Sequence, residues 1–165
     1  MTITPDAEDL LRLEHQVCFA LTNATRAFGA VYRDALKDLG LTYPQYLVMI
    51  ALWQHGELTV KRLGELLRLD SGTLSPLLKR LETAGLLVRE RSALDERSVL
   101  VRTTATGEAL RESAGEVPRT IARRTGFDPD ELRELQRLLG RLTERLDAAV
   151  GGPVSGPDTV GPAGR

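Results

Sequence analysis

Apolar residues recur every three or four positions along most of the chain, the spacing of one helix face. From residue 8 to residue 39 this spacing is unbroken until Gly40 supplies a stop, which predicts a single long helix. A mean helix has only about 11–12 residues. We therefore expect this one to cross between two protomers.

A second helix is predicted to begin after Thr42. Thr42 and Gln45 form a capping box, and Pro44 lies in the first turn, where its missing N–H is tolerated. The run YLVMIALW that follows is apolar almost all round. We therefore expect a buried helix that ends near His55 and Gly56.

Residues 59–102 predict two short helices and a β-hairpin. Thr59 caps the first helix, Asp70 caps the second, and Gly85 lies just past its end. Two apolar runs, residues 86–89 and 98–101, flank a polar turn and form the hairpin. Helix, turn, helix and hairpin together predict a winged helix-turn-helix, in a fold that is mainly α with a small β-hairpin wing. The inner face of the second helix consists of Leu74, Leu77, Leu78 and Leu81.

After the hairpin, Thr104 caps a helix that continues to about Arg124, and we expect Pro118 to bend it. Asp128 and Pro129 then open a last helix. Its leucines recur three and four residues apart and, with the long first helix, predict a dimer interface. These leucines are Leu132, Leu135, Leu139, Leu142 and Leu146.

The domain assignment follows from these elements. We expect residues 1–150 to form one domain, in which residues 59–102 are the helix-turn-helix and wing and residues 8–39 and 104–149 are dimerisation helices. Residues 151–165 are rich in Gly and Pro and are expected to be a disordered tail.

The outer face of the second short helix is typical of a helix that enters the major groove. Short hydrogen-bonding groups lie near its N-terminal half and cations further along, where they can meet bases and phosphates. Pro76 is expected to be tolerated because its missing N–H lies within or next to the first turn. The candidate DNA-binding residues on this face are Ser71, Thr73, Ser75, Pro76, Lys79 and Arg80.

At the tip of the hairpin, Arg97 is a candidate for insertion into the adjacent minor groove, with the Asp95 carboxylate two residues away to hold its guanidinium. Residues 60–102 hold nine Lys/Arg against six Asp/Glu, while the whole chain has a formal net charge of −1. Because this surplus is modest, we expect two copies to share a palindromic operator. The alternative is a helix pair that binds protein.

Composition excludes several other classes. No apolar run of about 18 residues and no signal segment occurs, so we expect neither membrane nor export but a cytoplasmic protein. One cysteine cannot form an internal disulfide, and two histidines without clustered acids predict no metal site. The chain shows no phosphate loop and no acid/base pair, so we expect no cofactor and no enzyme.

The segment LRLDSGTLSPLLKRLETAGLLVRERSALDERSVLVRTTATG resembles the MarR family of bacterial transcription regulators. It includes the Asp-x-Arg of the wing and the Thr-x-x-Gly that opens the next helix. The resemblance implies a homodimeric winged-helix protein that binds double-stranded DNA.

Cys18 is the residue with the most distinctive reaction chemistry. On its position alone it is either a small packed side chain or a reactive thiol. LEHQVCFALTNATRAFGAVY and LGLTYPQYLVMIALW resemble the OhrR subgroup, and the likeness covers roughly residues 10 to 147. This resemblance implies that Cys18 is a peroxide-reactive thiolate and that Tyr32 and Tyr43 hydrogen-bond it. The alternative for both phenols is ordinary packing.

Helix geometry adds a condition to this assignment. Fourteen residues of one helix separate Cys18 from Tyr32 by about 21 Å. Tyr32 can therefore reach only the Cys18 of the partner chain. Some OhrR-like proteins carry a tyrosine where this chain has Thr22, so the rearrangement after oxidation is left open.

The lone cysteine places the chain with the one-cysteine type, whose sulfenic acid condenses with a small external thiol, cyclises on a backbone nitrogen or overoxidises. The expected function is a repressor that releases its operator when organic hydroperoxide oxidises Cys18, so that a peroxide-resistance gene is expressed. One alternative is a MarR-type repressor released by a reversible phenolic ligand. A less favoured one is a thiol peroxidase.

Overall fold

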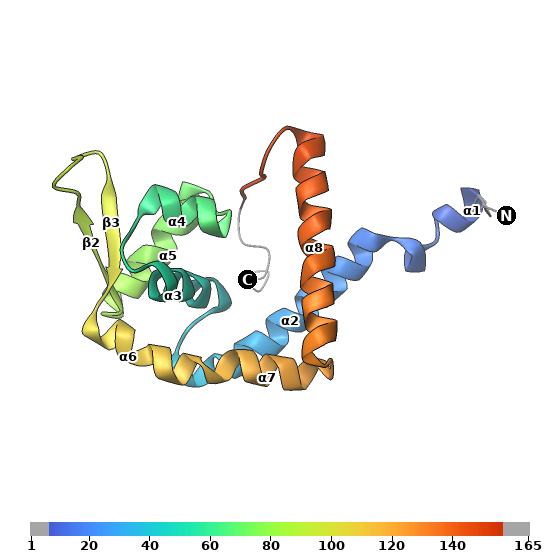
Figure 1. Cartoon of the computed structure of the whole chain (residues 1–165), viewed down its shortest axis with the longest axis horizontal. Coiled ribbons are helices and arrows are strands. Elements are labelled where there is room, and N and C mark those ends of the chain that lie inside the picture. Colours follow the sequence, from blue (N-terminus) through green and yellow to red (C-terminus); the bar gives the residue numbers. More distant parts are fainter. Residues whose placement is uncertain (1–6, 157–165) are drawn as a thin grey trace.

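The computed structural model describes residues 7–156, and most of them are helical (Figure 1). In chain order the elements are α1 (Ala7–Leu10), the 3-10 helix η1 (Leu13–His15), α2 (Val17–Ala35), the 3-10 helix η2 (Lys37–Leu39), α3 (Tyr43–His55), β1 (Leu58–Thr59), α4 (Val60–Leu67), α5 (Ser71–Thr83), β2 (Leu87–Arg91), β3 (Val99–Thr103), α6 (Ala105–Ala114), α7 (Glu116–Thr125) and α8 (Pro129–Val150). The predicted fold class, mainly α with a winged helix-turn-helix, is confirmed.

The wing is an antiparallel sheet with the strand order β1-β3-β2. In the hairpin, Leu87 pairs with Thr103 and Arg91 with Val99. Strand β1 adds a third member by pairing Leu58 with Val101. The hairpin was predicted but β1 was not, because two residues are too few to show an alternating pattern.

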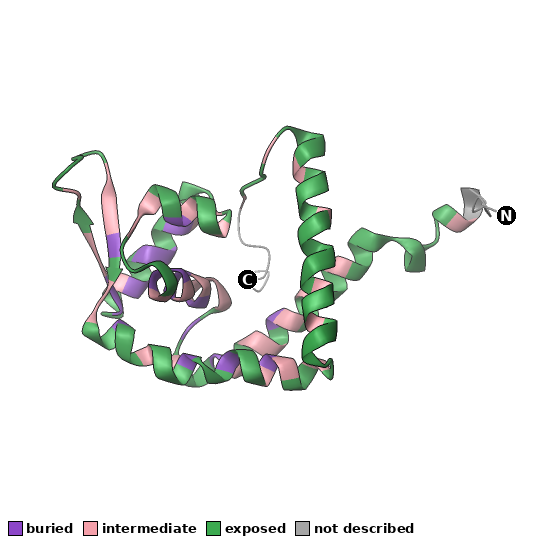
Figure 2. Cartoon of the chain, viewed as in Figure 1, coloured by how far each residue is buried: buried purple, intermediate pink, exposed green. Residues whose placement is uncertain are grey.

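The core lies between α3, the helix-turn-helix and the sheet. Helix α3 is apolar on every side and is covered on every side, as expected from YLVMIALW: Val48 and Met49 are fully buried. Leu63 of α4 and Leu78 of α5 are also fully buried, and Val101 closes the core from the sheet. Figure 2 shows the buried residues concentrated here and along α6 and α7.

The predicted helix caps are present. Thr42 and Gln45 form the capping box of α3, and the Asp70 carboxylate accepts the Thr73 N–H at the start of α5. Thr104 caps α6, and Asp128 caps α8. These polar signals set where each helix begins, because they satisfy N–H groups that the helix cannot satisfy itself.

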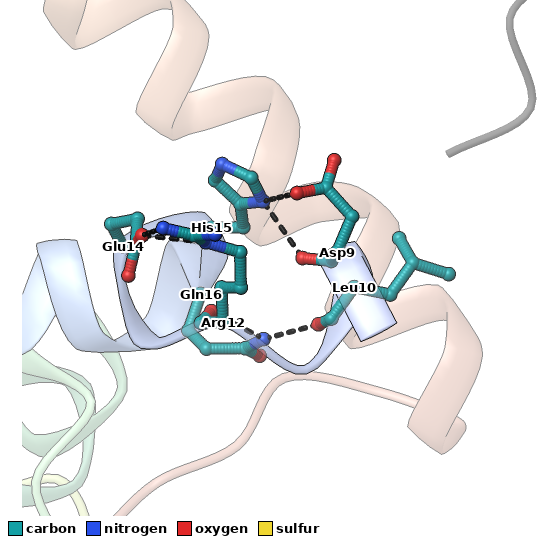
Figure 3. Close-up of polar contacts among 6 residues, drawn as sticks. All are labelled: Asp9, Leu10, Arg12, Glu14, His15 and Gln16. Carbon is teal, nitrogen blue, oxygen red and sulfur yellow. Dashed lines mark hydrogen bonds and ion pairs between the residues drawn. The ribbon is translucent and has the colours of Figure 1, made fainter. Parts of the chain in front are cut away.

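The prediction of one continuous helix from residue 8 to residue 39 is wrong. The segment consists of α1, η1, α2 and η2, and Gln16 between η1 and α2 is extended (φ −85°, ψ 107°). Figure 3 shows the polar contacts that support this break: the Gln16 side-chain amide donates to the carbonyl of Leu10 at 2.7 Å, and His15 Nδ1 lies 2.8 Å from the carbonyl oxygen of Asp9. Residues 11–20 are all exposed, so no packing opposes the break.

Two predictions near the C-terminus also need correction. The bend expected at Pro118 is a break at Gly115 between α6 and α7, because the Pro118 ring clashes with the carbonyl four residues before it, that of Ala114. The tail expected to be disordered from residue 151 is ordered to residue 156, where Gly156 pairs with Leu69. Residues 157–165 lie outside the described part.

Candidate nucleic-acid interface and sensor thiol

Helix α5 presents the face that the sequence assigned to DNA. Its leucines are buried, while Lys79 and Arg80 are exposed and Thr73 is half-buried. Ser71, Ser75 and Pro76 complete the exposed side. The structure thus brings these predicted contact residues together on one polar surface.

Pro76 lies further along α5 than the first turn. It is the sixth residue of the helix, so its missing N–H removes the bond that the Gly72 carbonyl would accept. The helix continues because Leu74, Leu78 and Leu81, on either side of Pro76, are buried in the core with α3 and the sheet. The expectation that Pro76 is tolerated is confirmed, but the reason is tertiary packing and not the helix terminus.

A groove of about 650 Å³ runs between the helix-turn-helix and the wing. Ser71 and Ser75 of α5 line it, as do Arg97 from the wing tip and Lys61 from α4. The recognition helix and the tip of the wing therefore line the same groove, to which Lys61 and Arg97 contribute cations.

Asp95 does not bind the guanidinium of Arg97, contrary to expectation. Its carboxylate accepts the backbone N–H of Arg97 at 3.0 Å and the hydroxyl of Ser98 at 3.0 Å. Two residues of spacing in a turn favour this backbone contact, which fixes the shape of the tip. The Arg97 side chain is exposed to solvent at the end of a turn that Asp95 holds in a fixed conformation.

An ion pair that was not predicted from the sequence joins the recognition helix to the wing. Arg89 of β2 donates from Nε and Nη2 to Glu82 Oε2 at 3.1 and 2.7 Å, and its backbone N–H donates to Glu82 Oε1 at 3.1 Å. The hydrogen bonds from Arg89 lower the pKa of Glu82. The signal available in the sequence was an acid at the end of a helix and an arginine in the following strand.

Cys18 is the second residue of α2 and is exposed in the single chain. The Thr22 hydroxyl donates to the Cys18 carbonyl at 2.8 Å, so it serves the helix backbone. Cys18 and Tyr32 lie on the same α-helix, about 21 Å apart by helix rise. One chain therefore does not bring the thiol to the tyrosines.

Tyr32 and Tyr43 do come together, with ring centroids 4.4 Å apart. The ring centroid of Tyr46 lies 6.3 Å from that of Tyr32. Desolvation raises the pKa of Tyr32, and desolvation with neighbouring Tyr32 and Tyr43 raises that of Tyr46 to about 12. The hydroxyl groups of Tyr32 and Tyr46 are therefore neutral near pH 7.

The two tyrosines line a mostly apolar pocket of about 480 Å³ between α2, α3, α7 and α8. Phe28, Ile121 and Leu139 form much of its wall. Its size and composition suit a small apolar molecule.

Two further kinds of site were sought in residues 7–156, a metal site and a membrane-spanning helix. No group of three or more His, Cys, Asp and Glu side chains in this range is arranged to hold a metal ion. None of the helices described there is long and apolar enough to cross a membrane.

Comparison with known proteins places this geometry in a family. The profile of the family described as transcriptional regulator SarA/Rot matches residues 30–113. The organic hydroperoxide resistance transcriptional regulator of Bacillus subtilis is 46% identical over 138 residues, which cover 84% of this chain and 94% of that protein.

Solved structures agree with the sequence match. Reduced AbfR bound to DNA, a protein also solved from Staphylococcus epidermidis, superposes with a TM-score of 0.71 at 34% identity, covering 86% of this chain and 99% of that one. AbfR has further been solved in an overoxidised form bound to DNA and in a disulfide form. BpsR of Bordetella bronchiseptica, whose DNA binding is regulated by 6-hydroxynicotinic acid, has a TM-score of 0.73 at 27% identity, covering 79% of this chain and 95% of that one.

Proposed function

The chain belongs to the MarR-type winged-helix transcriptional regulators, and from this premise we propose that it is a repressor that releases a palindromic operator when an organic hydroperoxide oxidises Cys18. The observation that carries the proposal is the combination of one lone thiol on α2 with a polar recognition helix on the same chain. The relative from Bacillus subtilis, named for organic hydroperoxide resistance, supports the choice of oxidant.

DNA binding is assigned to α5 and the wing. Ser71, Ser75 and Lys79 are exposed on α5 and are assigned to bases and phosphates in the major groove, and the exposed Arg97 is assigned to the minor groove. The DNA-bound structures of AbfR support this assignment.

Exposed apolar side chains on α8 and on the N-terminal segment support dimerisation. No residue of α8 is buried, although Leu146 and Val150 give it an apolar face that is 57% and 66% exposed. Leu11 and Val17 are 85% and 62% exposed. Apolar faces of this extent on two long segments are typical of a subunit interface. In such a dimer, residues 8–39 and 104–149 make the shared boundary, and the partner chain brings Tyr32 and Tyr43 to Cys18.

The chemical step is a two-electron oxidation of sulfur. The Cys18 thiolate attacks one peroxide oxygen, an S–O bond forms, the O–O bond breaks, and the alkoxide takes a proton and leaves as an alcohol. The sulfenic acid then condenses with a small thiol to a mixed disulfide and releases water. Because overoxidised AbfR is found on DNA, we assign release to the mixed disulfide and not to the overoxidised thiol.

Release of the operator is explained by the volume that the mixed disulfide adds at Cys18. A mixed disulfide adds several heavy atoms to a side chain at the proposed boundary, and close-packed interiors do not absorb added volume without moving. The shift of α2 and α8 changes the separation of the two recognition helices, so they no longer match half-sites one helical turn apart.

The test is a gel shift with the promoter palindrome. Wild-type protein binds, loses the DNA after an organic hydroperoxide with a small thiol, and regains it after a strong thiol reductant. Cys18→Ser binds equally well and is not released, because serine oxygen is not oxidised by the peroxide. Release of the Cys18→Ser protein by hydroperoxide would remove Cys18 from the mechanism.

The apolar pocket favours a second candidate, release by a reversible small ligand such as a phenolic acid. The pocket beside Tyr32 and Tyr43 has a suitable volume, and BpsR is regulated by a small aromatic acid. Thiol reductants separate the two functions, because they restore binding after oxidation and leave ligand-induced release unchanged.

A further inference from the structure

One ion pair ties the end of α8 to the turn of the helix-turn-helix. Arg68 Nη1 and Nη2 donate to Asp147 Oδ1 and Oδ2 at 3.0 and 2.7 Å, across 79 residues of sequence. Among the ion pairs of residues 7–156 it is the one that joins α8 to the winged helix. The planar fork of an arginine on a carboxylate fixes direction as well as distance.

The chain that follows α8 strengthens the same junction. The Gly152 N–H donates to the Asp147 carbonyl at 2.9 Å and turns the chain back toward the helix-turn-helix, as Figure 1 shows. The Gly156 N–H then donates to the Arg68 carbonyl at 3.2 Å, and Gly156 pairs with Leu69. Arg68 is therefore held through both its side chain and its backbone.

Arg68 is an unusual residue for this turn. Its φ of 55° is the one positive value of a non-glycine residue among the described residues, and glycine would adopt it with less strain. Asp147 is well covered, with 17% of its side chain exposed, and the hydrogen bonds from Arg68 lower its pKa. An arginine at a glycine-like position is explained by what its side chain binds.

We propose that Arg68 and Asp147 are positioning residues for operator binding, which carry the position of α8 to the N-terminus of the recognition helix. Asp70, the cap of α5, follows Arg68 by two residues, so a displacement of Arg68 reaches the first turn of α5 directly. The proposal rests on the proposed function, because it makes this junction the link between the dimer helices and the DNA-binding surface.

Asp147→Asn is the decisive variant because two explanations predict opposite signs. If Asp147 is only an acidic surface residue, loss of its negative charge near DNA strengthens binding. If it positions Arg68, operator affinity falls, by roughly 2- to 30-fold for a coupling residue outside the DNA contact. Glu144→Gln is the matched control, since it removes the same charge one turn earlier on the exposed side of α8.

Arg68→Gly sharpens the test. It removes the ion pair and also the strain of a positive φ, so the melting temperature is unchanged or higher while operator affinity falls. A residue that only stabilises the fold would show a lower melting temperature. The charge-exchanged pair Arg68→Asp with Asp147→Arg restores affinity toward the wild type, because aspartate tolerates a positive φ.

Amide hydrogen exchange tests the Arg68–Asp147 junction in the absence of DNA. Asp147→Asn speeds exchange in residues 68–74 of the reduced protein, and Glu144→Gln does not. A wild-type protein that fails to bind the palindrome would contradict the proposed function, while the exchange result would still decide the junction. Equal affinity of Asp147→Asn and Glu144→Gln for the operator, with unchanged exchange, would overturn the positioning role.

Discussion

The winged helix and the flanking helices satisfy their apolar residues in different ways. In the winged helix, Leu63 and Leu78 are fully buried by neighbours from the same chain. In α8 no residue is buried, and Phe19 near the start of α2 is 40% exposed. The winged helix has a core that is completed within one chain. The flanking helices leave apolar side chains uncovered in one chain. Cys18, the proposed sensor thiol, lies in this second region, where the partner subunit is proposed to pack.

Under the proposed function, stability and regulation lie in different parts of the molecule. A complete core has one packed arrangement and resists change. An interface between two copies can shift as a body, because it is held by fewer contacts and by symmetry. A switch that acts by displacing packed groups therefore belongs in the second region.

The largest expected effect distinguishes the two regions by truncation. Leu78→Ala removes a fully buried side chain from the core and lowers the free energy of unfolding by about 2–5 kcal/mol. Leu146→Ala changes it by about 0.5 kcal/mol or less in dilute protein, because that side chain is 57% exposed. Urea unfolding at low and high protein concentration measures both, and Leu146→Ala should lose stability only at high concentration. A loss equal to that of Leu78→Ala at every concentration would contradict the comparison.

Replacing a glycine by alanine in each region gives the next largest difference in stability. A Cβ at Gly107 would lie 2.0 Å from the Leu86 carbonyl oxygen, so Gly107→Ala forces backbone apart and lowers stability by about 1–3 kcal/mol or more. A Cβ at Gly140 of α8 meets no atom within 4 Å, so Gly140→Ala raises stability by about 1 kcal/mol through helix propensity. Thermal unfolding of the two variants beside the wild type measures the opposite signs. Stabilisation by Gly107→Ala would show that α6 does not pack on the turn at Leu86.

The last effect is absent near neutral pH and appears only in alkali. Folding raises the pKa of Tyr46 from 10.0 to about 12, so the folded protein holds this proton more tightly than the unfolded chain. The corresponding stability is present below pH 10 and is lost as the pH rises through about 12. Tyrosinate absorbance recorded with circular dichroism follows the change, and Tyr46→Phe moves alkaline unfolding to higher pH. Ionisation of Tyr46 near pH 10 with the fold intact would refute its burial.

Local signals predicted the winged helix well. Caps such as Thr42 and Asp70 and the leucine spacing of α5 act within a few residues, so the sequence displays them directly. The break at Gln16 could not be predicted the same way, because apolar spacing does not show whether a neighbour covers the helix. Strand β1 depends on pairing with Val101, more than forty residues away.

The candidate site was predicted in part for the same reason. The polar face of α5 follows from helix periodicity, so its residues were identified correctly as one surface. The partner of Arg97 was wrong, because the Asp95 carboxylate binds the backbone N–H and not the guanidinium. Glu82–Arg89 and Arg68–Asp147 were missed because each joins separate elements, and Cys18 and its tyrosines remain a prediction until the dimer is measured.

Oxidation of the Cys18 sulfur is proposed to control the affinity of the protein for its operator. The direct measurement is a titration of the operator complex with an organic hydroperoxide in the presence of a small thiol, with bound DNA followed by fluorescence anisotropy and the protein by intact mass. We expect the fraction of DNA released to follow the fraction of Cys18 that carries the thiol adduct. Complete modification of Cys18 with the DNA still bound, or release with the thiol unmodified, would contradict it.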